Sequence, residues 1–159
     1  MCYMPIIPYT KQYKDNQRQD TELAYLAGII DGEGYISIVR HKDTRLKKGY
    51  TLFPIFRITN SNKDALLEIN EFIKGKIKSN GLSKNPNHKQ VYRIEVIQLK
   101  RIREILREVK PYLIIKEPHA TLMISFCNQR LKSKVKNYSE DDFKIADLFS
   151  NLNKKGRVS

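Results

Sequence analysis

The hydrophobic pattern of the chain changes abruptly at Gly32 and Gly34, and this change constrains the fold more than any other feature. Apolar residues within 23–30 recur at the spacing of a helix, for which residues 20–21 offer an N-cap. Over residues 35–42, apolar and polar residues alternate with the period of a strand. The chain must therefore leave a helix and enter a sheet within a few residues.

The same two periods alternate along the remainder of the chain and predict an α+β fold. The predicted segments end at turn or cap signals, such as the Asn80-Gly81 pair and a capping box formed by Ser61 and Asp64. The expected strands are 35–42, 50–60, 82–84 and 90–97, and the expected helices are 20–31, 61–81, 99–109, 116–131 and a short one after Ser139. The order α-β-β-α-β-β-α, followed by two more helices, is typical of an antiparallel sheet backed by helices.

The chain has 159 residues, which suits one domain with an appendage at each end. We expect an extended N-terminal arm over 1–19, a core domain over 20–133, and a C-terminal helix and tail over 134–159, with 153–159 disordered. Tyrosines alternate with basic residues in the arm, which either lies along a nucleic-acid backbone or packs on its own domain. No apolar run approaches the roughly 20 residues of a membrane span and no secretion signal is present, which predicts an intracellular protein.

A net charge of +13 indicates a polyanionic partner. Residues 35–60 carry six Lys or Arg and one acid, and residues 72–103 carry nine and one, whereas the other acids gather in the expected helices. A positive sheet with a more neutral helical back suits DNA or RNA, although a solvated basic face would show the same pattern. A membrane surface is the weakest candidate, because no basic helix carries an aromatic face.

The nine residues 26–34 read LAGIIDGEG and resemble the signature of the LAGLIDADG family of homing endonucleases, with six identical positions. Ile29 and Gly32 are mild changes, and Glu33 keeps the carboxylate of the family's second Asp. The resemblance covers about residues 21–131 and implies the family's α-β-β-α-β-β-α fold, in which an antiparallel sheet forms a saddle on DNA. It also implies an intron-encoded enzyme that makes a staggered double-strand break in a long, pseudo-palindromic DNA site.

The end of the motif helix offers oxygen ligands for a metal ion. Near Gly32 the backbone carbonyls lose their partners within the helix, and the helix dipole makes this end negative. Glu33 adds a carboxylate at the same place. Gly32 and Glu33 are therefore candidate ligands for Mg²⁺, or for another divalent cation such as Mn²⁺ or Ca²⁺, and Glu33 is the first candidate catalytic residue. A solvated turn glutamate is the alternative interpretation.

Small residues on the motif helix predict that a second helix packs against it. Ala24, Gly28 and Asp31 share one face at helical spacing, as do Ala27 and Ile30. A glycine in a helix costs about 1 kcal/mol relative to Ala, so it needs a packing reason. An ordinary buried helix with a glycine defect is the alternative. Because one motif cannot cut two strands, we expect a two-fold homodimer whose interface includes Ala24, Ala27, Gly28 and Asp31.

Two more catalytic candidates follow from the resemblance. In homodimeric relatives a lysine follows a Pro-aromatic-Leu stretch and serves the water network, and residues 111–116 match this pattern with Lys116. A polar amide often ends the second strand, where this chain has Asn60. A solvated lysine at a helix start and a turn residue before the Ser61 cap are the respective alternatives. An Arg that some relatives carry four residues beyond Asn60 is replaced by Asp64.

The strand alternation places Leu52, Phe56 and Ile58 inward and leaves the opposite face for DNA, although a register error of one residue would reverse the faces. Arg57 and Arg93 are expected to read base edges, because a guanidinium can bind guanine through two hydrogen bonds. The predicted DNA contacts on the strands and hairpin loops are Ser37, Val39, His41, Lys42, Arg45, Lys47, Lys48, Thr51, Phe53, Ile55, Arg57, Lys84, His88, Lys89, Val91 and Arg93.

Two other functions would use the same features. An RNA-splicing maturase of this fold would bind RNA and could lack a working metal site, and a DNA-binding regulator would bind without cutting. The presence of Glu33 and Lys116 favours the nuclease. We expect double-stranded DNA as the partner, no membrane partner, and a location in an organelle (mitochondrion or chloroplast) or a prokaryotic cytoplasm.

Overall fold

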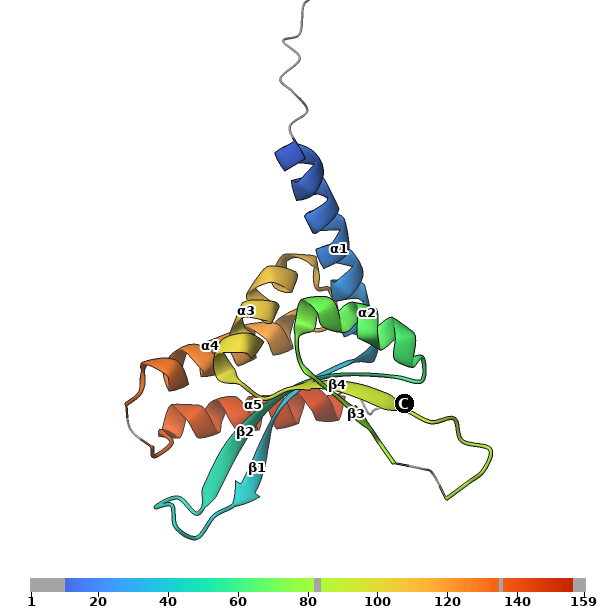
Figure 1. The fold of residues 1–159 in the computed structure, drawn as a ribbon. Coiled ribbons are helices and arrows are strands. Elements are labelled where there is room, and N and C mark those ends of the chain that lie inside the picture. The colour runs from blue at the N-terminus through green and yellow to red at the C-terminus, as the bar shows by residue number, and fades with distance from the viewer. Residues whose placement is uncertain (1–10, 82–83, 135, 156–159) are drawn as a thin grey trace, which may run out of the picture.

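The computed structural model describes residues 11–81, 84–134 and 136–155 (Figure 1). The elements are α1 (Lys11–Glu33), β1 (Gly34–Lys42), β2 (Tyr50–Asn60), α2 (Lys63–Ile73), β3 (Lys76–Ser79), β4 (Tyr92–Val96), α3 (Leu99–Val109), the 3-10 turn η1 (Lys110–Tyr112), α4 (Glu117–Lys132) and α5 (Glu140–Lys155). The order α-β-β-α-β-β-α with two further helices confirms the predicted α+β fold.

The four strands form one antiparallel sheet in the order β1-β2-β4-β3. Even-numbered residues such as Phe56, Ile58 and Ile94 are buried beneath the helices, while their odd-numbered neighbours face away from them. The predicted strand faces are therefore confirmed. Figure 1 shows the helices α1 to α4 on one side of the sheet and the two hairpins diverging below them, which gives the sheet the shape of a saddle.

The hydrophobic core fills the space between this sheet face and the helices. Ile30 of α1, Phe56 of β2, Ile105 of α3, Phe126 of α4 and Phe149 of α5 are all fully buried. Burying a side chain of this size stabilises the fold by about 1.5–3 kcal/mol. The helix α2 adds Leu66 and Ile73 to the same core, so all the described α-helices meet in one core that fixes their positions relative to the sheet.

The motif helix α1 is longer than expected. It begins at Lys11 rather than at Asp20, so the prediction of an extended arm over 1–19 was wrong from Lys11 onward, and residues 1–10 lie outside the described residues. Most residues of 11–20 are Lys, Gln, Arg or other residues compatible with a helix, so the helix can continue upstream of the part that packs on the core. Asp20 does not cap α1, and its carboxylate instead accepts a hydrogen bond from the Tyr112 hydroxyl at 2.8 Å.

The helix α2 begins and ends at residues other than those expected. Asn62, not Ser61, is the N-cap, because its Oδ1 accepts a hydrogen bond from the backbone N–H of Ala65 at 3.1 Å. The helix ends at Ile73, since Lys74 takes a left-handed conformation with φ of 53°.

The side chain of Asn70 explains why the helix stops early. It accepts a hydrogen bond from Gly75 N at 2.8 Å and donates one to Gly75 O at 3.1 Å, which turns the chain toward the sheet. A Cβ at Gly75 would lie 2.7 Å from the Ile94 side chain, so glycine is required there. The third strand therefore begins at Lys76 rather than at residue 82, and Ile77, which we expected on the helix, pairs with Ile94.

The last helix, α5, is also longer than expected. Ser139 and Asp142 form the predicted capping box, with Ser139 N donating to Asp142 Oδ2 at 2.8 Å and Asp142 N donating to Ser139 Oγ at 3.2 Å. The helix continues to Lys155, so the prediction of disorder was wrong for residues 153–155, while 156–159 lie outside the described residues.

The helix α5 lies along β1, at the edge of the sheet. Asn153 Nδ2 donates to Ser37 Oγ at 3.2 Å at one end, and Arg40 pairs with Asp147 farther along the strand. The Tyr138 hydroxyl, just before α5, donates to Leu52 O at 3.2 Å. None of the described helices combines the length and the apolar character needed to cross a lipid bilayer.

Only glycine fits at the junction between α1 and β1. A Cβ at Gly34 would lie 2.5 Å from Ile30 O and 3.0 Å from Ile30 Cα. A Cβ at Gly32 would have nothing within 4 Å. The two glycines that flank Glu33 therefore differ, because Gly34 lets the chain pass directly from helix to strand and Gly32 leaves the helix end open.

The carboxylate of Asp31 ties the end of α1 to the segment that leads into α4. It accepts hydrogen bonds from the backbone N–H groups of Ile114 at 2.9 Å, Ile115 at 3.1 Å and Lys116 at 2.8 Å. Partial burial acts to raise the pKa of the Asp31 carboxyl, but these N–H groups and the Lys116 ammonium outweigh it, so the pKa lies below its ordinary value.

We predict that Gly34→Ala lowers the free energy of unfolding by about 1–3 kcal/mol, because the added methyl group must displace the backbone at Ile30. Urea unfolding followed by circular dichroism measures the effect. Gly32→Ala is the matched control, since its methyl group meets nothing and it should be neutral or slightly stabilising. Equal effects of the two substitutions would contradict the proposed junction.

We predict that Asp31→Asn costs about 1–2 kcal/mol of stability at neutral pH, because the hydrogen bonds to Asp31 lose their charge. Since folding lowers the pKa of Asp31, its contribution is present above the ordinary carboxyl pKa and is lost as the pH falls through the folded value. The stability difference between the wild type and the variant should therefore shrink between about pH 5 and pH 2. Urea unfolding across this range tests it, with the exposed Asp64→Asn as control, and a pH-independent difference would refute it.

Candidate functional site

The end of α1 presents an exposed carboxylate. Glu33 is the last residue of the helix, and both Glu33 and Gly32 are exposed. The carbonyls of the last turn carry the negative end of the helix dipole, so the carboxylate and the carbonyls together form an oxygen-rich, negative centre. This geometry agrees with the two predicted metal ligands, Gly32 and Glu33, lying side by side in an accessible position.

Lys116 lies at the same helix end. Its Nζ donates a hydrogen bond to the Asp31 carbonyl at 3.0 Å, and its backbone N–H is held by the Asp31 carboxylate. The side chain is half-buried, so it does not extend freely into solvent as the alternative interpretation supposed. The Lys116 ammonium is therefore fixed on the carbonyl of Asp31, which lies two residues before Glu33 in the helix. The catalytic role of Lys116 stays a prediction.

Asn60 ends β2 and has a structural task. Its Oδ1 accepts a hydrogen bond from Asn62 N at 2.8 Å, which forms the turn into α2. This contact favours the turn interpretation that the sequence left open. The neighbouring Lys63 does not point to the end of α1, because its Nζ lies 5.5 Å from the centre of the Tyr92 ring. The catalytic role of Asn60 stays a prediction.

The predicted dimer residues divide into two groups. Ala24 and Gly28 are exposed on α1, as the prediction requires. Ala27 is fully buried in the core of its own protomer, so its assignment to the interface was wrong. The Asp31 carboxylate is occupied by backbone N–H groups of the same chain, so its assignment to a helix-helix seam is also corrected.

Sequence reasoning missed the apolar side chains that flank this exposed stripe. Tyr25 on α1 is 69% exposed, and Ile114 and Ile115, next to the Asp31 carboxylate, are 85% and 67% exposed. Leu67 on α2 is also exposed. Apolar residues that fall outside the buried face of a helix were the available signal, and exposed apolar side chains of this kind often mark an interaction surface.

The outward sheet face carries the predicted strand contacts, with one exception. Thr51, Ile55, Arg57 and Arg93 are partly exposed. Ser37 is buried and bonded to Asn153 of α5, so its assignment to DNA contact was wrong. The remaining outward strand positions available to a ligand are Val39, His41, Phe53 and Val91.

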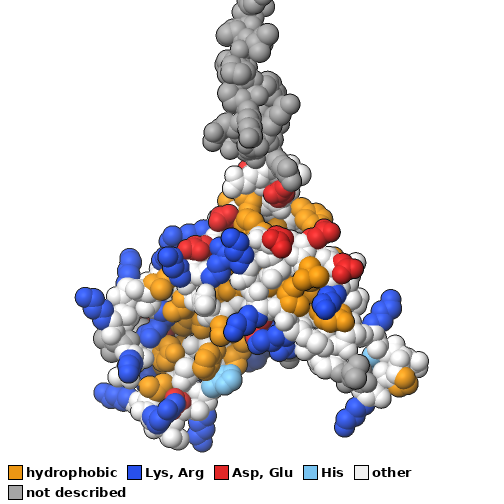
Figure 2. Space-filling view, in the orientation of Figure 1, with side chains coloured by type: hydrophobic (Ala, Val, Ile, Leu, Met, Phe, Trp, Pro, Cys, Tyr) orange, Lys and Arg blue, Asp and Glu red, His pale blue; other side chains and the backbone are white. Residues whose placement is uncertain are grey.

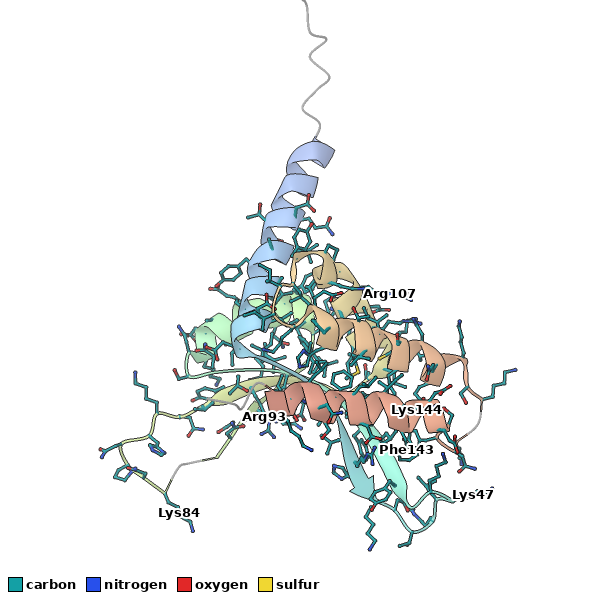
Figure 3. All side chains as sticks on the ribbon, turned by 180° about the vertical axis from the view of Figure 1, so that it is seen from behind. Lys47, Lys84, Arg93, Arg107, Phe143 and Lys144 are labelled. Atoms are coloured by element: carbon teal, nitrogen blue, oxygen red, sulfur yellow. The ribbon has the colours of Figure 1, made fainter. Side chains whose placement is uncertain are left out.

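Basic residues gather at the tips of both hairpins. Figure 3 shows Lys47 and Lys84 at the two tips, and Lys42, Lys48 and Lys89 are exposed near them, as is His88. The Arg45 guanidinium donates to the Asp43 carboxylate at 2.9 Å and lowers the pKa of Asp43 to about 2. Arg45 therefore shapes its loop as well as adding charge to it.

The outward face also contains an ion cluster that the sequence did not reveal. Glu95 of β4 lies 2.7 Å from the guanidinium of Arg57 and 2.6 Å from the Nζ of Lys78, with Arg93 Nε at 3.6 Å. The hydrogen bond from Lys78, opposed by partial burial and supported by Arg57, lowers the pKa of Glu95 to about 2. Only the register of β2, β4 and β3 brings these residues together, so spacing along the chain gave no signal.

The helical side is less neutral than expected. Arg103 and Arg107 of α3 both donate to Asn128 Oδ1 at 3.1 Å, and Arg107 is exposed (Figure 3). Acidic side chains gather instead around α1 and α2 (Figure 2). The prediction of a more neutral back therefore holds for α1 and α2 but not for α3.

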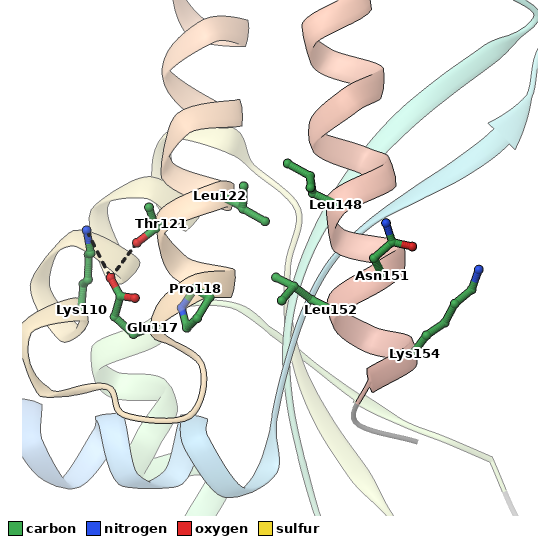
Figure 4. A pocket seen from close by; sticks show the side chains of 9 residues that line it. All are labelled: Lys110, Glu117, Pro118, Thr121, Leu122, Leu148, Asn151, Leu152 and Lys154. Carbon is green, nitrogen blue, oxygen red and sulfur yellow. Dashed lines mark hydrogen bonds and ion pairs between the residues drawn. The ribbon is translucent and has the colours of Figure 1, made fainter. Parts of the chain in front are cut away.

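A groove of about 820 Å³ lies between α4 and α5, and Glu33 is not among the residues that line it (Figure 4). Its one acid, Glu117, accepts a hydrogen bond from Thr121 at 2.7 Å and pairs with Lys110 at 3.6 Å, so the polar groups at this end of the groove are satisfied by each other. Within the described part of the chain, no three His, Cys, Asp or Glu side chains gather closely enough to hold a metal ion by themselves.

Comparison with known proteins identifies the family. The family model described as LAGLIDADG endonuclease matches residues 26–122, which is more than half of the chain. No curated protein sequence matches the chain.

Solved homing endonucleases share the fold. The archaeal intron-encoded I-Vdi141I complexed with DNA is 21% identical, with a TM-score of 0.69 over 89% of this chain and 87% of that chain. I-CvuI in complex with its target in the presence of 2 mM Ca is 19% identical, with a TM-score of 0.68 over 86% and 85%. I-CvuI with an I-CreI target and 2 mM Mg, in which the DNA is not cleaved, is 17% identical, with a TM-score of 0.67 over 86% and 83%.

The matched region runs from the motif helix through the sheet into α4, and therefore contains Glu33, Lys116 and the basic sheet face. The chain accordingly belongs to the LAGLIDADG endonuclease family, and its activity is that of a site-specific DNA endonuclease.

Proposed function

We propose that two copies of this chain form a homodimer that makes a staggered double-strand break in a long, pseudo-palindromic DNA site with the help of a divalent cation. The observation that carries this proposal is that the Lys116 ammonium is bound to the Asp31 carbonyl at the end of α1 where Glu33 stands, next to a basic sheet face. A carboxylate and a fixed ammonium at the base of a positive saddle suit hydrolysis of a phosphodiester that the saddle holds.

Gly28 supports the dimer. It lies within a helix, where glycine costs about 1 kcal/mol relative to Ala. Within its own protomer a Cβ at Gly28 would meet nothing within 4 Å, so the protomer gives no reason for a glycine. A second α1 packed backbone to backbone would supply that reason, and the exposed Tyr25, Ile114 and Ile115 would be covered in the same contact.

The homodimer would also explain how both strands of the DNA are cut. A two-fold axis beside Gly28 places two Glu33 carboxylates near each other. Because the minor groove is only about 6 Å wide, two such centres can address phosphates on both of its sides. One chain therefore supplies each half of a pseudo-palindromic site.

The residues at the end of α1 fit a divalent cation. They are hard oxygen donors in an open position, and each protomer offers a single carboxylate, so the partner protomer and the DNA phosphates would complete the ligand set. We propose Mg²⁺ as the physiological ion, with Mn²⁺ and Ca²⁺ as alternatives, and two similar structures were solved with DNA and Mg or Ca. When bound, such an ion activates water and stabilises the leaving oxygen.

Lys116 would serve the reaction from a fixed position. The Asp31 carbonyl holds its Nζ, so the ammonium keeps its orientation without help from a substrate. A cation there can orient the attacking water and offset the charge that develops on the phosphate. The turn bond to Asn62 uses the Oδ1 of Asn60, so an amide contact to the water network would come from its Nδ2.

RNA splicing as a maturase is the second candidate function. The observation that favours it is the pair of guanidiniums at Arg103 and Arg107, which forms a basic patch on the helical side, away from the saddle. An organelle or a prokaryotic cytoplasm stays the predicted location for either activity.

We predict that Glu33→Gln reduces DNA cleavage at least about 100-fold, because the amide cannot replace a charged metal ligand. Cleavage gels with and without Mg²⁺ measure the loss, and gel shifts in Ca²⁺ should show unchanged DNA binding. Glu108→Gln removes an equal charge from an exposed site on α3 and should cleave normally. A maturase or a DNA-binding regulator would be indicated if Glu33→Gln left every measured activity intact.

We predict that Gly28→Leu converts the dimer to a monomer and abolishes double-strand cleavage, because the larger side chain holds the two α1 helices apart. The fold of each protomer should persist, since the new side chain meets only open space there. Analytical ultracentrifugation measures the mass, and Ser125→Leu, an exposed position on α4, is the control. A wild-type protein that is monomeric on its DNA would refute the dimer.

A further inference from the structure

Glu95 is the one acid among the residues of the four strands, and it stands on the face that the proposed function turns toward DNA. Across the sheet it occupies a row with Tyr35 of β1, Arg57 of β2 and Lys76 of β3. This row is next to the row that contains Gly34, the residue after Glu33. An acid at such a position repels phosphate, so its presence calls for a reason.

The contacts of Glu95 supply that reason, because they hold two arginines in fixed directions. Arg57 donates to Glu95 Oε2 through Nε at 3.2 Å and through a terminal nitrogen at 2.7 Å, so one carboxylate oxygen accepts two charge-assisted hydrogen bonds. The Arg57 guanidinium carbon also lies over the Tyr35 ring, 5.8 Å from its centre. Lys78 donates to Oε1 at 2.6 Å, which anchors the carboxylate from the other side.

Arg93 makes a hydrogen bond to Asn80 and an ion pair with Glu95. One terminal nitrogen donates to Asn80 Oδ1 at 2.7 Å, while Nε faces Glu95 at 3.6 Å and has no hydrogen-bond partner among the described residues. The Arg93 side chain is only 27% exposed, so it cannot swing freely over the surface. The outward face of β2 and β4 therefore presents two oriented guanidiniums, those of Arg57 and Arg93, instead of two mobile ones.

We propose that Glu95 is a positioning residue that fixes Arg57 and Arg93 for reading the base pairs nearest the cleavage centre, and that it thereby determines sequence specificity there. The proposal rests on the proposed DNA-cleaving function. It does not make Glu95 a catalytic residue, because its carboxylate is occupied by the three cations and its side chain is only 12% exposed.

Charge and entropy both explain how this arrangement would favour specific over non-specific binding. A guanidinium already held in place loses less side-chain freedom when it binds a base, which improves discrimination between bases. Two of the five Arg57 donors are used by Glu95, so the remaining N–H groups have defined directions. The negative charge meanwhile weakens contact between these cations and any phosphate, whatever the sequence.

Glu95→Gln tests the proposal, with Glu108→Gln as the matched loss of one charge on the helical side. The preferred site of the wild type is first selected from a randomised DNA duplex library. The affinity for that site, for its single-base variants and for an unrelated duplex of equal length is then measured at several salt concentrations for each protein.

We expect Glu95→Gln to bind the unrelated duplex more tightly than the wild type, with a salt slope steeper by up to about 0.9, because freed cations reach phosphates. Discrimination at the affected base pairs should fall about 5- to 100-fold. Glu108→Gln should change neither quantity. A purely structural role for Glu95 would instead weaken binding to every duplex alike.

Unchanged base discrimination in Glu95→Gln would overturn the proposal. If that variant unfolds, Arg57→Gln and Lys78→Met are compared instead, the second of which removes an anchor of the carboxylate. Both variants should lose discrimination at the same base pairs. Loss of discrimination at different base pairs in the two variants would overturn the proposal. Wild-type protein that selects no site from the library would count against the proposed function itself, which separates the two failures.

Discussion

The hydrogen bonds between the Asp31 carboxylate and the backbone of residues 114–116 are the contact on which the rest of the site depends. They join the end of the motif helix to a segment more than eighty residues away in sequence. A helix C-terminus is already negative, so placing Asp31 and Glu33 there concentrates charge that must be offset. The N–H groups and the Lys116 ammonium provide that offset, and in doing so they bring Lys116 to the same helix end as Glu33.

The sequence predicted the sheet well because burial on one face leaves a pattern with a period of two. Phe56 and Ile58 alternate with polar residues, so the two faces of the strands and the bounds of β1 and β2 could be inferred. The end of α2 was missed because a left-handed Lys74 and the bonds from Asn70 to Gly75 have no comparable pattern. The start of α1 was missed for a related reason, since a polar helix beyond the packed face has no apolar period.

Placing Glu33 and Lys116 at one end of α1 was possible because both positions match the family pattern, while their catalytic roles stay predictions. Prediction failed where a position depends on what packs against it. A small residue such as Ala27 suits the core of its own protomer as well as an interface, and Ser37 looks exposed until α5 is placed along β1. The Glu95 cluster needs the register of three strands, which no single segment encodes.

The two edge strands of the sheet, β1 and β3, are protected in different ways. The helix α5 covers the outer side of β1, and the other border, β3, is only four residues long and carries Lys76 and Lys78. Short, lysine-bearing border strands discourage pairing with strands of another molecule. The sheet is therefore poorly suited to continuing into a neighbour as a longer sheet. In the homodimer proposed above, the protomers would therefore associate through their helices, which would leave the strands for nucleic acid.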